Sequence, residues 1–397
     1  KIIDPKDGQE KVVLSSFVSR GIGGLVFINT ESGEGEWLDM PGDEGAWALL
    51  PIEDKKLLVG TCGIKGYLHC LDLETRTWAE PLCDENETYI WNLVQGSDGM
   101  IYGGTYPGCV LLQYNPQKHI LKNMGKMSKY EGDMYSRTVW QVPGHILINC
   151  GIEKPHITLF NIKTGSYKPF GKEGAQIKEV NTDFICTEMN GELDLYDIGT
   201  FKLLDKNLYI SRIEKTKTAS GINDKRIPFN KSIGGVLQLK NDKLFGIRSQ
   251  EYFLLGKESE KLTFKKIPVE APATGILTIT SDDCGNIWGS SNFGQTIFCY
   301  NKGNGKYFNT SSVCNNGGEV YGIRCLKNKV YMTCYSGGDH VVYDPEKPWD
   351  QINNINPRTL KSVAPDFIRP GAKSVIGPDG AFWTGWTAKY GVYGGGI

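Results

Sequence analysis

The chain has 397 residues, and its 44 basic and 45 acidic residues leave a formal net charge of −1. No basic arm or patch stands out, so the sequence gives no electrostatic support for a nucleic-acid partner. No apolar run reaches the roughly 18 residues that a membrane span needs, so no membrane partner is predicted either.

The clearest structural signal is the stretch 89–116. It predicts an apolar strand, a turn at Ser97-Asp98-Gly99, a second strand that breaks at Gly103-Gly104, a short loop and a third strand. Much of the remaining chain consists of degenerate copies of this unit. Because such repeats bury their faces only against neighbours, we expect residues 1–397 to form a single domain, although the length alone suggests two or three.

In chain order, the first expected piece lacks its innermost strand, and complete copies follow it. The expected piece, copies and last partial copy are 13–40, 45–81, 89–124, 136–170, 180–204 (a weaker copy), 234–268, 275–311, 320–345 and 373–397. Two polar segments interrupt them. Residues 205–230 are interpreted as an extended outer connection, and 349–370 as an insertion.

The expected third strands end in a shared pattern, an aromatic residue or Leu followed by Asp or Asn. Its instances are Leu71-Asp72, Tyr114-Asn115, Phe160-Asn161, Tyr196-Asp197, Tyr300-Asn301 and Tyr343-Asp344. They recur every 36 to 46 residues, with one interval about twice as long. This period is typical of four-stranded antiparallel propeller blades, and the Asp or Asn is expected to cap the hairpin that follows.

The sequence therefore predicts an all-β fold, a β-propeller with eight blades, or seven if the weak copy at 180–204 is not a blade. The N- and C-terminal strands are expected to close the ring together. In a propeller, the loops that enter first strands and those that join second to third strands share one rim. We expect the ligand site at that rim, because these loops are longer and more irregular.

The predicted rim collects aromatic, basic and histidine side chains, a mixture that favours a polar, anionic ligand with flat apolar faces, such as an acidic sugar. The candidate substrate-binding residues are Tyr89, Trp91, Lys154, Asn292, Asp339, Arg369, Lys373, Trp386 and Tyr390. The candidate catalytic residues are His156, His340, Tyr106, Tyr135, Tyr335 and Arg137.

His156 and His340 open the third strands of two different copies, four units apart. In an eight-fold ring they would face each other across the axis. Histidines satisfied by backbone groups are the alternative interpretation.

The strand–turn–strand wording at 96–116, 282–301 and 377–386 resembles the broad group of β-propellers that contains virginiamycin B lyase and polysaccharide lyases such as ulvan lyase. The resemblance extends over most of the chain as a blade pattern. It implies a lyase-like activity but assigns no role to any residue, because no catalytic motif of those families matches here.

The first functional hypothesis is a lyase that acts on an acidic or polar saccharide by β-elimination. This reaction needs a base for the proton next to the carboxylate, a cation for the enolate and an acid at the leaving oxygen. His156 or His340 is the candidate base, and Arg137 or Lys373 the candidate carboxylate clamp. Tyr106, Tyr135 and Tyr335 are the candidate acids.

The alternative hypothesis is a binding module without chemistry, for a glycan or a protein partner. The polar segments 205–230 and 349–370 would then contact the partner. No cofactor is predicted. A divalent metal is an open alternative, with His156, His340 and Asp339 as its candidate ligands.

Eleven cysteines, an odd number, are scattered through expected strands without a CxxC pair. This pattern favours small buried thiols in a reducing, cytoplasmic compartment. The chain begins at Lys1 without a methionine. Export followed by removal of a signal segment therefore stays open as the alternative.

Overall fold

A computed structural model describes residues 1–52, 55–205, 224, 226–227, 233, 235–258, 261–371 and 374–397. Most of the segment predicted as an outer connection, 205–230, lies outside this part, as does Lys373. The described chain is built from β-strands with one short 3-10 helix, η1 (Lys240–Asp242). Nowhere in these residues is there a helix of the length and apolarity that crossing a membrane requires.

The strands form successive antiparallel sheets, which we number in chain order. Sheet 1 holds β1 (Ile2–Ile3), β2 (Glu10–Ser16), β3 (Gly24–Asn29) and β4 (Gly35–Asp39). Sheet 2 holds β5 (Gly45–Ile52), β6 (Lys56–Cys62), β7 (Tyr67–Asp72) and β8 (Leu82–Cys83). Sheet 3 holds β9 (Tyr89–Gln95), β10 (Ile101–Tyr106), β11 (Val110–Asn115) and β12 (Ile120–Lys126). A bridge between Cys62 and Tyr89 joins sheets 2 and 3.

The middle of the chain continues the pattern. Sheet 4 holds β13 (Ser136–Val142), β14 (His145–Cys150), β15 (His156–Asn161) and β16 (Tyr167–Phe170). Sheet 5 holds β17 (Gln176–Val180), β18 (Phe184–Met189) and β19 (Glu192–Asp197). Sheet 6 holds β20 (Leu237–Gln238), β21 (Leu244–Arg248), β22 (Glu251–Leu255) and β23 (Lys265–Lys266).

The last three sheets complete the described chain. Sheet 7 holds β24 (Ile276–Ser281), β25 (Ile287–Ser291), β26 (Ile297–Tyr300) and β27 (Tyr307–Asn309). Sheet 8 holds β28 (Glu319–Leu326), β29 (Lys329–Tyr335), β30 (Asp339–Tyr343) and β31 (Arg358–Ser362). Sheet 9 is split between β32 (Phe367–Pro370), β35 (Trp386–Ala388) and β36 (Gly395–Gly396), and the pair β33 (Val375–Ile376) and β34 (Phe382–Trp383).

The predicted caps after the third strands are confirmed. Asp72 Oδ1 accepts hydrogen bonds from the backbone N–H groups of Glu74 and Thr75, at 3.0 and 2.8 Å. Asn161 Oδ1 accepts one from the Thr164 N–H at 2.9 Å in the same way. The side chain thus replaces a backbone acceptor in the turn, which is why Asp and Asn recur at this position.

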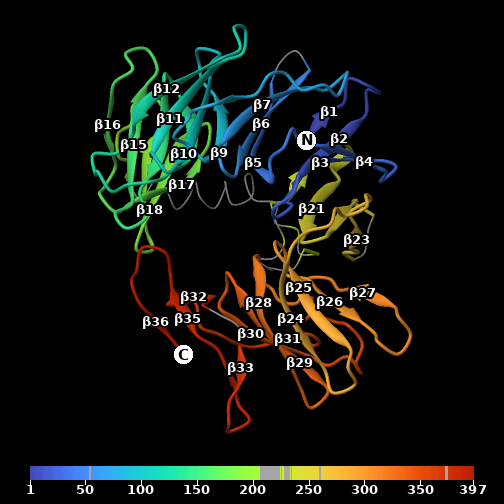
Figure 1. Ribbon diagram of the computed structural model, residues 1–397. Coiled ribbons are helices and arrows are strands. Elements are labelled where there is room, and N and C mark those ends of the chain that lie inside the picture. Colours follow the sequence, from blue (N-terminus) through green and yellow to red (C-terminus); the bar gives the residue numbers. More distant parts are fainter. Residues whose placement is uncertain are drawn as a thin grey trace.

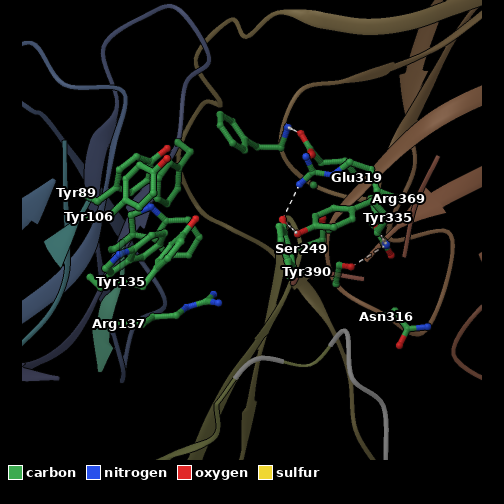
Figure 2. A pocket seen from close by; sticks show the side chains of 18 of the residues that line it. Tyr89, Tyr106, Tyr135, Arg137, Ser249, Asn316, Glu319, Tyr335, Arg369 and Tyr390 are labelled. Carbon is green, nitrogen blue, oxygen red and sulfur yellow. Dashed lines mark hydrogen bonds between the residues drawn. The ribbon is translucent and has the colours of Figure 1, made fainter. Parts of the chain in front are cut away.

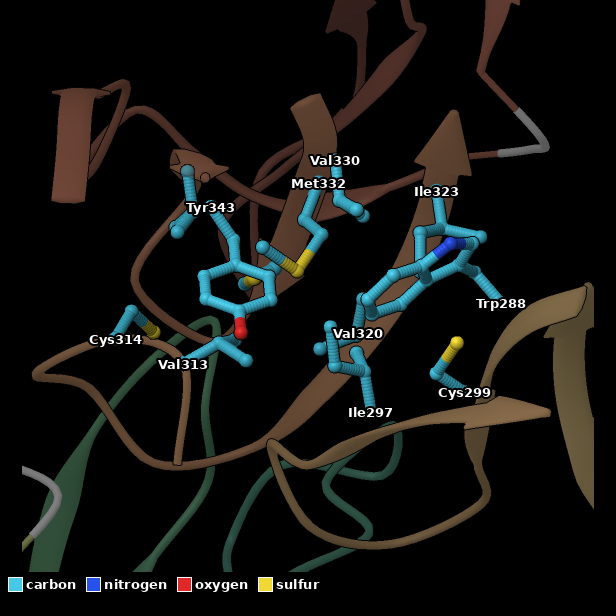
Figure 3. Packing of buried hydrophobic residues seen from close by; sticks show 12 residues of the cluster. Trp288, Ile297, Cys299, Val313, Cys314, Val320, Ile323, Val330, Met332 and Tyr343 are labelled. Carbon is cyan, nitrogen blue, oxygen red and sulfur yellow. The ribbon is translucent and has the colours of Figure 1, made fainter. Parts of the chain in front are cut away.

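The sheets lie radially around a common centre (Figure 1) and pack face to face. Neighbouring sheets bury apolar side chains between them, as Figure 3 shows for sheets 7 and 8, where Trp288 and Ile297 meet Val320, Ile323 and Met332. This burial stabilises the ring, because each sheet has too little apolar surface on its own to form a core.

The order of the sheets around the ring differs from their order in the sequence. One face of sheet 1, with Val12 and Ile28, packs on Phe245 and Tyr252 of sheet 6 (Figure 1). The other face of sheet 1, with Leu25 and Phe27, packs on sheet 2. Sheet 6 is therefore a neighbour of sheet 1, although four sheets separate them in sequence.

The expected closure by joined terminal strands is wrong for the described residues. β1 pairs with β2 inside sheet 1, and β36 pairs with β35 inside sheet 9. The short β1 gives the N-terminal sheet an inner strand of its own. It needs none from the C-terminus, because Ile2 and Ile3 complete the hairpin with Lys11 and Glu10.

All eleven cysteines are free, and eight of them are buried. Burial raises the pKa of Cys62 and of Cys299 to about 11. At about pH 8, only about one in a thousand of these two thiols is ionised, so they react slowly. We expect an alkylating reagent to modify the exposed Cys284 first and all eleven thiols after unfolding in urea.

Mass spectrometry of timed samples checks this order of reaction. A Cys284→Ser variant is the control, because it should lose the fast phase alone. Equal labelling of Cys62 and Cys284 in the folded protein would contradict the burial of Cys62.

Candidate functional site

A cavity of about 590 Å³ lies where the sheets converge. Residues of every sheet except sheet 5 line it. They come from first strands, from the ends of second strands, from the loops between second and third strands and from the loops that lead into first strands. Figure 2 shows the side chains on two facing walls, Tyr89, Tyr106 and Tyr135 on one and Tyr335 and Tyr390 on the other.

The first wall is aromatic. Tyr89 stacks on Trp91 with ring centroids 4.7 Å apart, and Trp47 lies 5.3 Å from Trp91. Tyr106 and Tyr135 continue the surface, with their centroids 4.7 Å apart. Burial raises the pKa of Tyr89 and of Tyr135, so both phenols stay neutral and protonated near neutral pH. Such a wall suits the flat C–H face of a sugar ring.

The aromatic wall extends across the ring and carries one cation. Phe17, which follows β2 of sheet 1, contacts Trp47 of sheet 2, with ring centroids 5.2 Å apart. On its other side it contacts Phe293, which follows β25 of sheet 7, with centroids 5.4 Å apart. Arg137 lies over Trp91, with its guanidinium carbon 5.2 Å from the ring centroid. This cation–π contact holds the guanidinium at the cavity while its N–H groups stay free to bind a ligand.

The second wall is built on Arg369 and two tyrosines. The guanidinium carbon lies 4.4 Å from the Tyr335 ring centroid, and Nη2 donates a hydrogen bond to Tyr390 Oη at 2.8 Å. The hydroxyls of Tyr390 and Tyr335 are 2.9 Å apart. Because Tyr390 Oη accepts from Arg369, its own proton is free to point at Tyr335.

Two groups on this wall, Tyr390 and Arg369, keep their protons near neutral pH. Burial, together with the hydrogen bond that Tyr390 donates to Tyr335, raises the pKa of Tyr390 to about 12, so it remains a donor. Burial alone would lower the pKa of Arg369, but the tyrosines around it raise the pKa above its usual value. Tyr335 therefore has a permanent cation on its ring face and a hydrogen-bond donor at its oxygen.

Gln295 fixes the backbone of Tyr335. Its Nε2 donates to the carbonyl oxygens of Tyr335 at 2.7 Å and of Gly317 at 3.0 Å, and the side chain is 2% exposed. Glu319 is the one carboxylate among the described residues that line the cavity. It accepts hydrogen bonds from the Phe293 N–H at 3.0 Å and from the Tyr321 hydroxyl at 3.3 Å.

Eight of the fifteen residues proposed from the sequence line this cavity. They are Tyr89, Trp91, Tyr106, Tyr135, Arg137, Tyr335, Arg369 and Tyr390. Lys373 lies outside the described residues. Their predicted roles in binding or catalysis remain predictions.

The two histidines do not line the cavity, and each has its own surroundings. His156 is 7% exposed, and its Nδ1 lies 2.9 Å from the Lys154 carbonyl oxygen and 3.7 Å from Asp133. His340 packs against Trp386, with ring centroids 5.0 Å apart, and burial lowers its pKa. The structure thus offers each of them a structural environment outside the cavity lining.

The remaining candidates also point elsewhere. Lys154 lies over the ring of Tyr130 at 5.1 Å, and Asn292 Nδ2 donates to Ser19 Oγ at 2.9 Å. Asp339 is 1% exposed and accepts a hydrogen bond from Asn316 at 2.6 Å. No group of three or more His, Cys, Asp and Glu side chains in the described part of the chain gathers as metal ligands would.

Several cavity residues were not among those proposed from the sequence. Trp47 occupies the same position in its first strand as Trp91 does in the next sheet, and this correspondence was a usable signal. Phe17 and Gln295 had no such signal, because Phe17 lies at the cavity through its contact with Phe293, and Gln295 through its hydrogen bonds to Gly317 and Tyr335.

Repeated antiparallel sheets around a central cavity define this protein as a β-propeller. No family model matches the chain. A comparison with curated proteins gives no match.

The chain is similar in fold to several solved β-propeller structures. One is the extracellular domain of a hybrid two-component system of B. thetaiotaomicron, with 13% identity and a TM-score of 0.37 over 93% of this chain and 56% of that one. The chain thus spans little more than half of that domain. Virginiamycin B lyase of Staphylococcus aureus gives 13% identity and 0.31 over 73% and 91%, and the WD40 propeller domain of Doa1 gives 14% and 0.36 over 73% and 87%. These proteins have different roles, and none assigns an activity to this chain.

Proposed function

We propose that the cavity binds an acidic saccharide and cleaves it by β-elimination. The observation that carries this proposal is the linked set Arg369, Tyr390 and Tyr335, in which a cation and a donor surround one phenol. The facing aromatic wall offers the apolar surface on which a sugar ring packs.

In this reaction Arg369 pairs with the carboxylate of the substrate. Its positive charge stabilises the negative charge that spreads onto this carboxylate when the neighbouring carbon loses its proton. Tyr335, as phenolate, accepts that proton, so an O–H bond forms while a C–H bond breaks. Tyr390 donates a hydrogen bond to the Tyr335 oxygen before the transfer and holds it in place.

The electron pair of the broken C–H bond forms a carbon–carbon double bond. The bond from the adjacent carbon to the glycosidic oxygen breaks, and that oxygen takes a proton from Tyr106 or Tyr135 on the facing wall. Both phenols line the cavity. The products are an unsaturated uronate and a saccharide with a new hydroxyl, and solvent restores the two tyrosines.

The second candidate is a propeller that binds the saccharide without cleaving it. No histidine or cysteine is among the described residues that line the cavity, and the pKa of Tyr390 is raised to about 12. Binding requires only the cation and the aromatic wall, so it does not depend on an ionised Tyr335.

A panel of uronate-containing polysaccharides separates these candidates. We expect at least one to give the ultraviolet absorbance of an unsaturated uronate when mixed with the protein. Calorimetric titration of the same panel measures binding alone. Binding without absorbance supports the second candidate, and neither binding nor absorbance with any member of the panel contradicts both.

A further inference from the structure

Two guanidinium groups face the cavity from opposite walls, and neither has a carboxylate partner in the part of the chain that the structure describes. Arg137 belongs to the first, aromatic wall and Arg369 to the second wall (Figure 2). Across the described residues, no Asp or Glu oxygen lies within the 4.0 Å that defines an ion pair for either of them. Arg76, by contrast, is held by both Asp4 and Glu36.

Glu319, the one carboxylate that the described residues bring to the cavity lining, does not neutralise the two guanidinium groups. Both oxygens of Glu319 accept hydrogen bonds from other groups, the Phe293 N–H and the Tyr321 hydroxyl. Two cations and one anion leave the cavity with a net positive charge. A ligand with one acidic group would compensate only one of the two guanidiniums.

Each guanidinium is held in place by aromatic rings. Arg137 lies on Trp91, which Tyr89 supports from a stacked position at 4.7 Å. Arg369 lies on Tyr335 and donates to Tyr390. Aromatic stacking keeps a guanidinium extended, and its planar N–H groups match the two oxygens of a carboxylate.

We infer that the cavity takes a saccharide with acidic groups on more than one residue, a uronide oligomer, whose separate carboxylates bind Arg369 and Arg137. This inference rests on the proposed function for the Arg369 side and adds a second anionic subsite on the facing wall. The aromatic surface between Trp91, Tyr89 and Tyr135 then carries the sugar rings that join the two acidic groups.

The test is a calorimetric titration with two probes, tetragalacturonate and the methyl glycoside of a single galacturonate. We expect Arg137→Gln to weaken tetragalacturonate binding by about 10- to 100-fold, the loss of one charge-assisted contact, and to leave single-residue binding within about twofold. Arg369→Gln should weaken binding of both probes, because it removes the subsite that both probes use.

Arg324→Gln is the matched control. Arg324 lies in β28 and donates to the Ile323 carbonyl oxygen, outside the cavity lining, so this variant removes the same charge without touching the subsite. It should bind both probes as the parent protein does.

The outcomes separate the inference from the proposed function. Equal losses for the two probes in Arg137→Gln, or no loss for either, overturn the second subsite and leave the Arg369 site standing. If the parent protein binds neither probe, the uronide inference fails, and the wider polysaccharide panel then decides the proposed function. Because the Arg137 side chain is exposed, we expect its replacement to leave the thermal midpoint unchanged.

Discussion

Replacing Tyr335 with Phe should lower the rate of uronide cleavage by about 10²- to 10⁴-fold, the usual contribution of a group that transfers a proton. The variant keeps the ring under Arg369 at 4.4 Å and loses only the hydroxyl that lies 2.9 Å from Tyr390. Substrate binding, and with it KM, should therefore change by less than about threefold. The loss of rate should appear in kcat. Initial rates from the absorbance of the unsaturated product give both constants.

The control for this substitution is Tyr307→Phe. Tyr307 is 75% exposed and does not line the cavity, so its variant should cleave at the parental rate. A Tyr335→Phe variant that retains most of the parental kcat would remove Tyr335 from the reaction.

The sequence suggested another base, His156 or His340, and the same assay tests it. Neither lines the cavity, and we expect a variant with both replaced by Ala to keep its turnover if it folds. Because His156 is 7% exposed, its folding must be confirmed by the thermal midpoint. Loss of turnover in a folded double variant, together with an active Tyr335→Phe, would restore the histidine hypothesis.

Gly104→Ala should destabilise the fold by about 3 kcal/mol, at the upper end of the usual cost of overpacking. A Cβ at this position would lie 1.9 Å from the Ser136 carbonyl oxygen, which is backbone of the neighbouring sheet and has no flexible end to move. The clash would also separate the Thr105 N–H from Ser136 Oγ, now 2.7 Å apart. The midpoint of urea unfolding should fall accordingly.

The adjacent glycine provides the comparison. A Cβ on Gly103 would meet the tip of Leu93 at 2.9 Å, and a leucine side chain can rotate away. Both glycines are buried in β10, so the two variants differ chiefly in what the new methyl group contacts. Similar midpoints for Gly103→Ala and Gly104→Ala would show that sheets 3 and 4 do not approach each other as closely as described.

The predictions of strands and turns depended on contacts between residues close together in the sequence, and the structure confirms most of them. Alternating apolar residues bounded by turns predicted the antiparallel sheets, most of which have four strands, and Asp72 and Asn161 cap their hairpins through their own neighbours. The rim residues Tyr89 and Tyr335 also lie at the cavity, because their places at strand ends follow from the same topology.

Packing between sheets followed no signal that the sequence displays. Sheet 6 lies on sheet 1 because Phe245 and Tyr252 present an apolar face that matches Val12 and Ile28. Many sheets here carry similar apolar faces, and burial is non-directional, so the pattern of residues does not say which faces meet. The expected joining of the terminal strands was wrong for a different reason, because β1 pairs with β2 and completes sheet 1 without a C-terminal strand.

By itself, then, the sequence determined the strands, their turns and which strand ends can reach a shared opening, since these depend on contacts between near neighbours in the chain. Only the tertiary structure decided that His156 lies outside the cavity lining, with its Nδ1 at the Lys154 carbonyl, and that Phe17 and Gln295 line the cavity. It also set Arg369 against Tyr335 and Tyr390. The direction of a side chain at the rim depends on how neighbouring sheets pack. The free energy of this packing is a sum over contacts between residues far apart in the sequence.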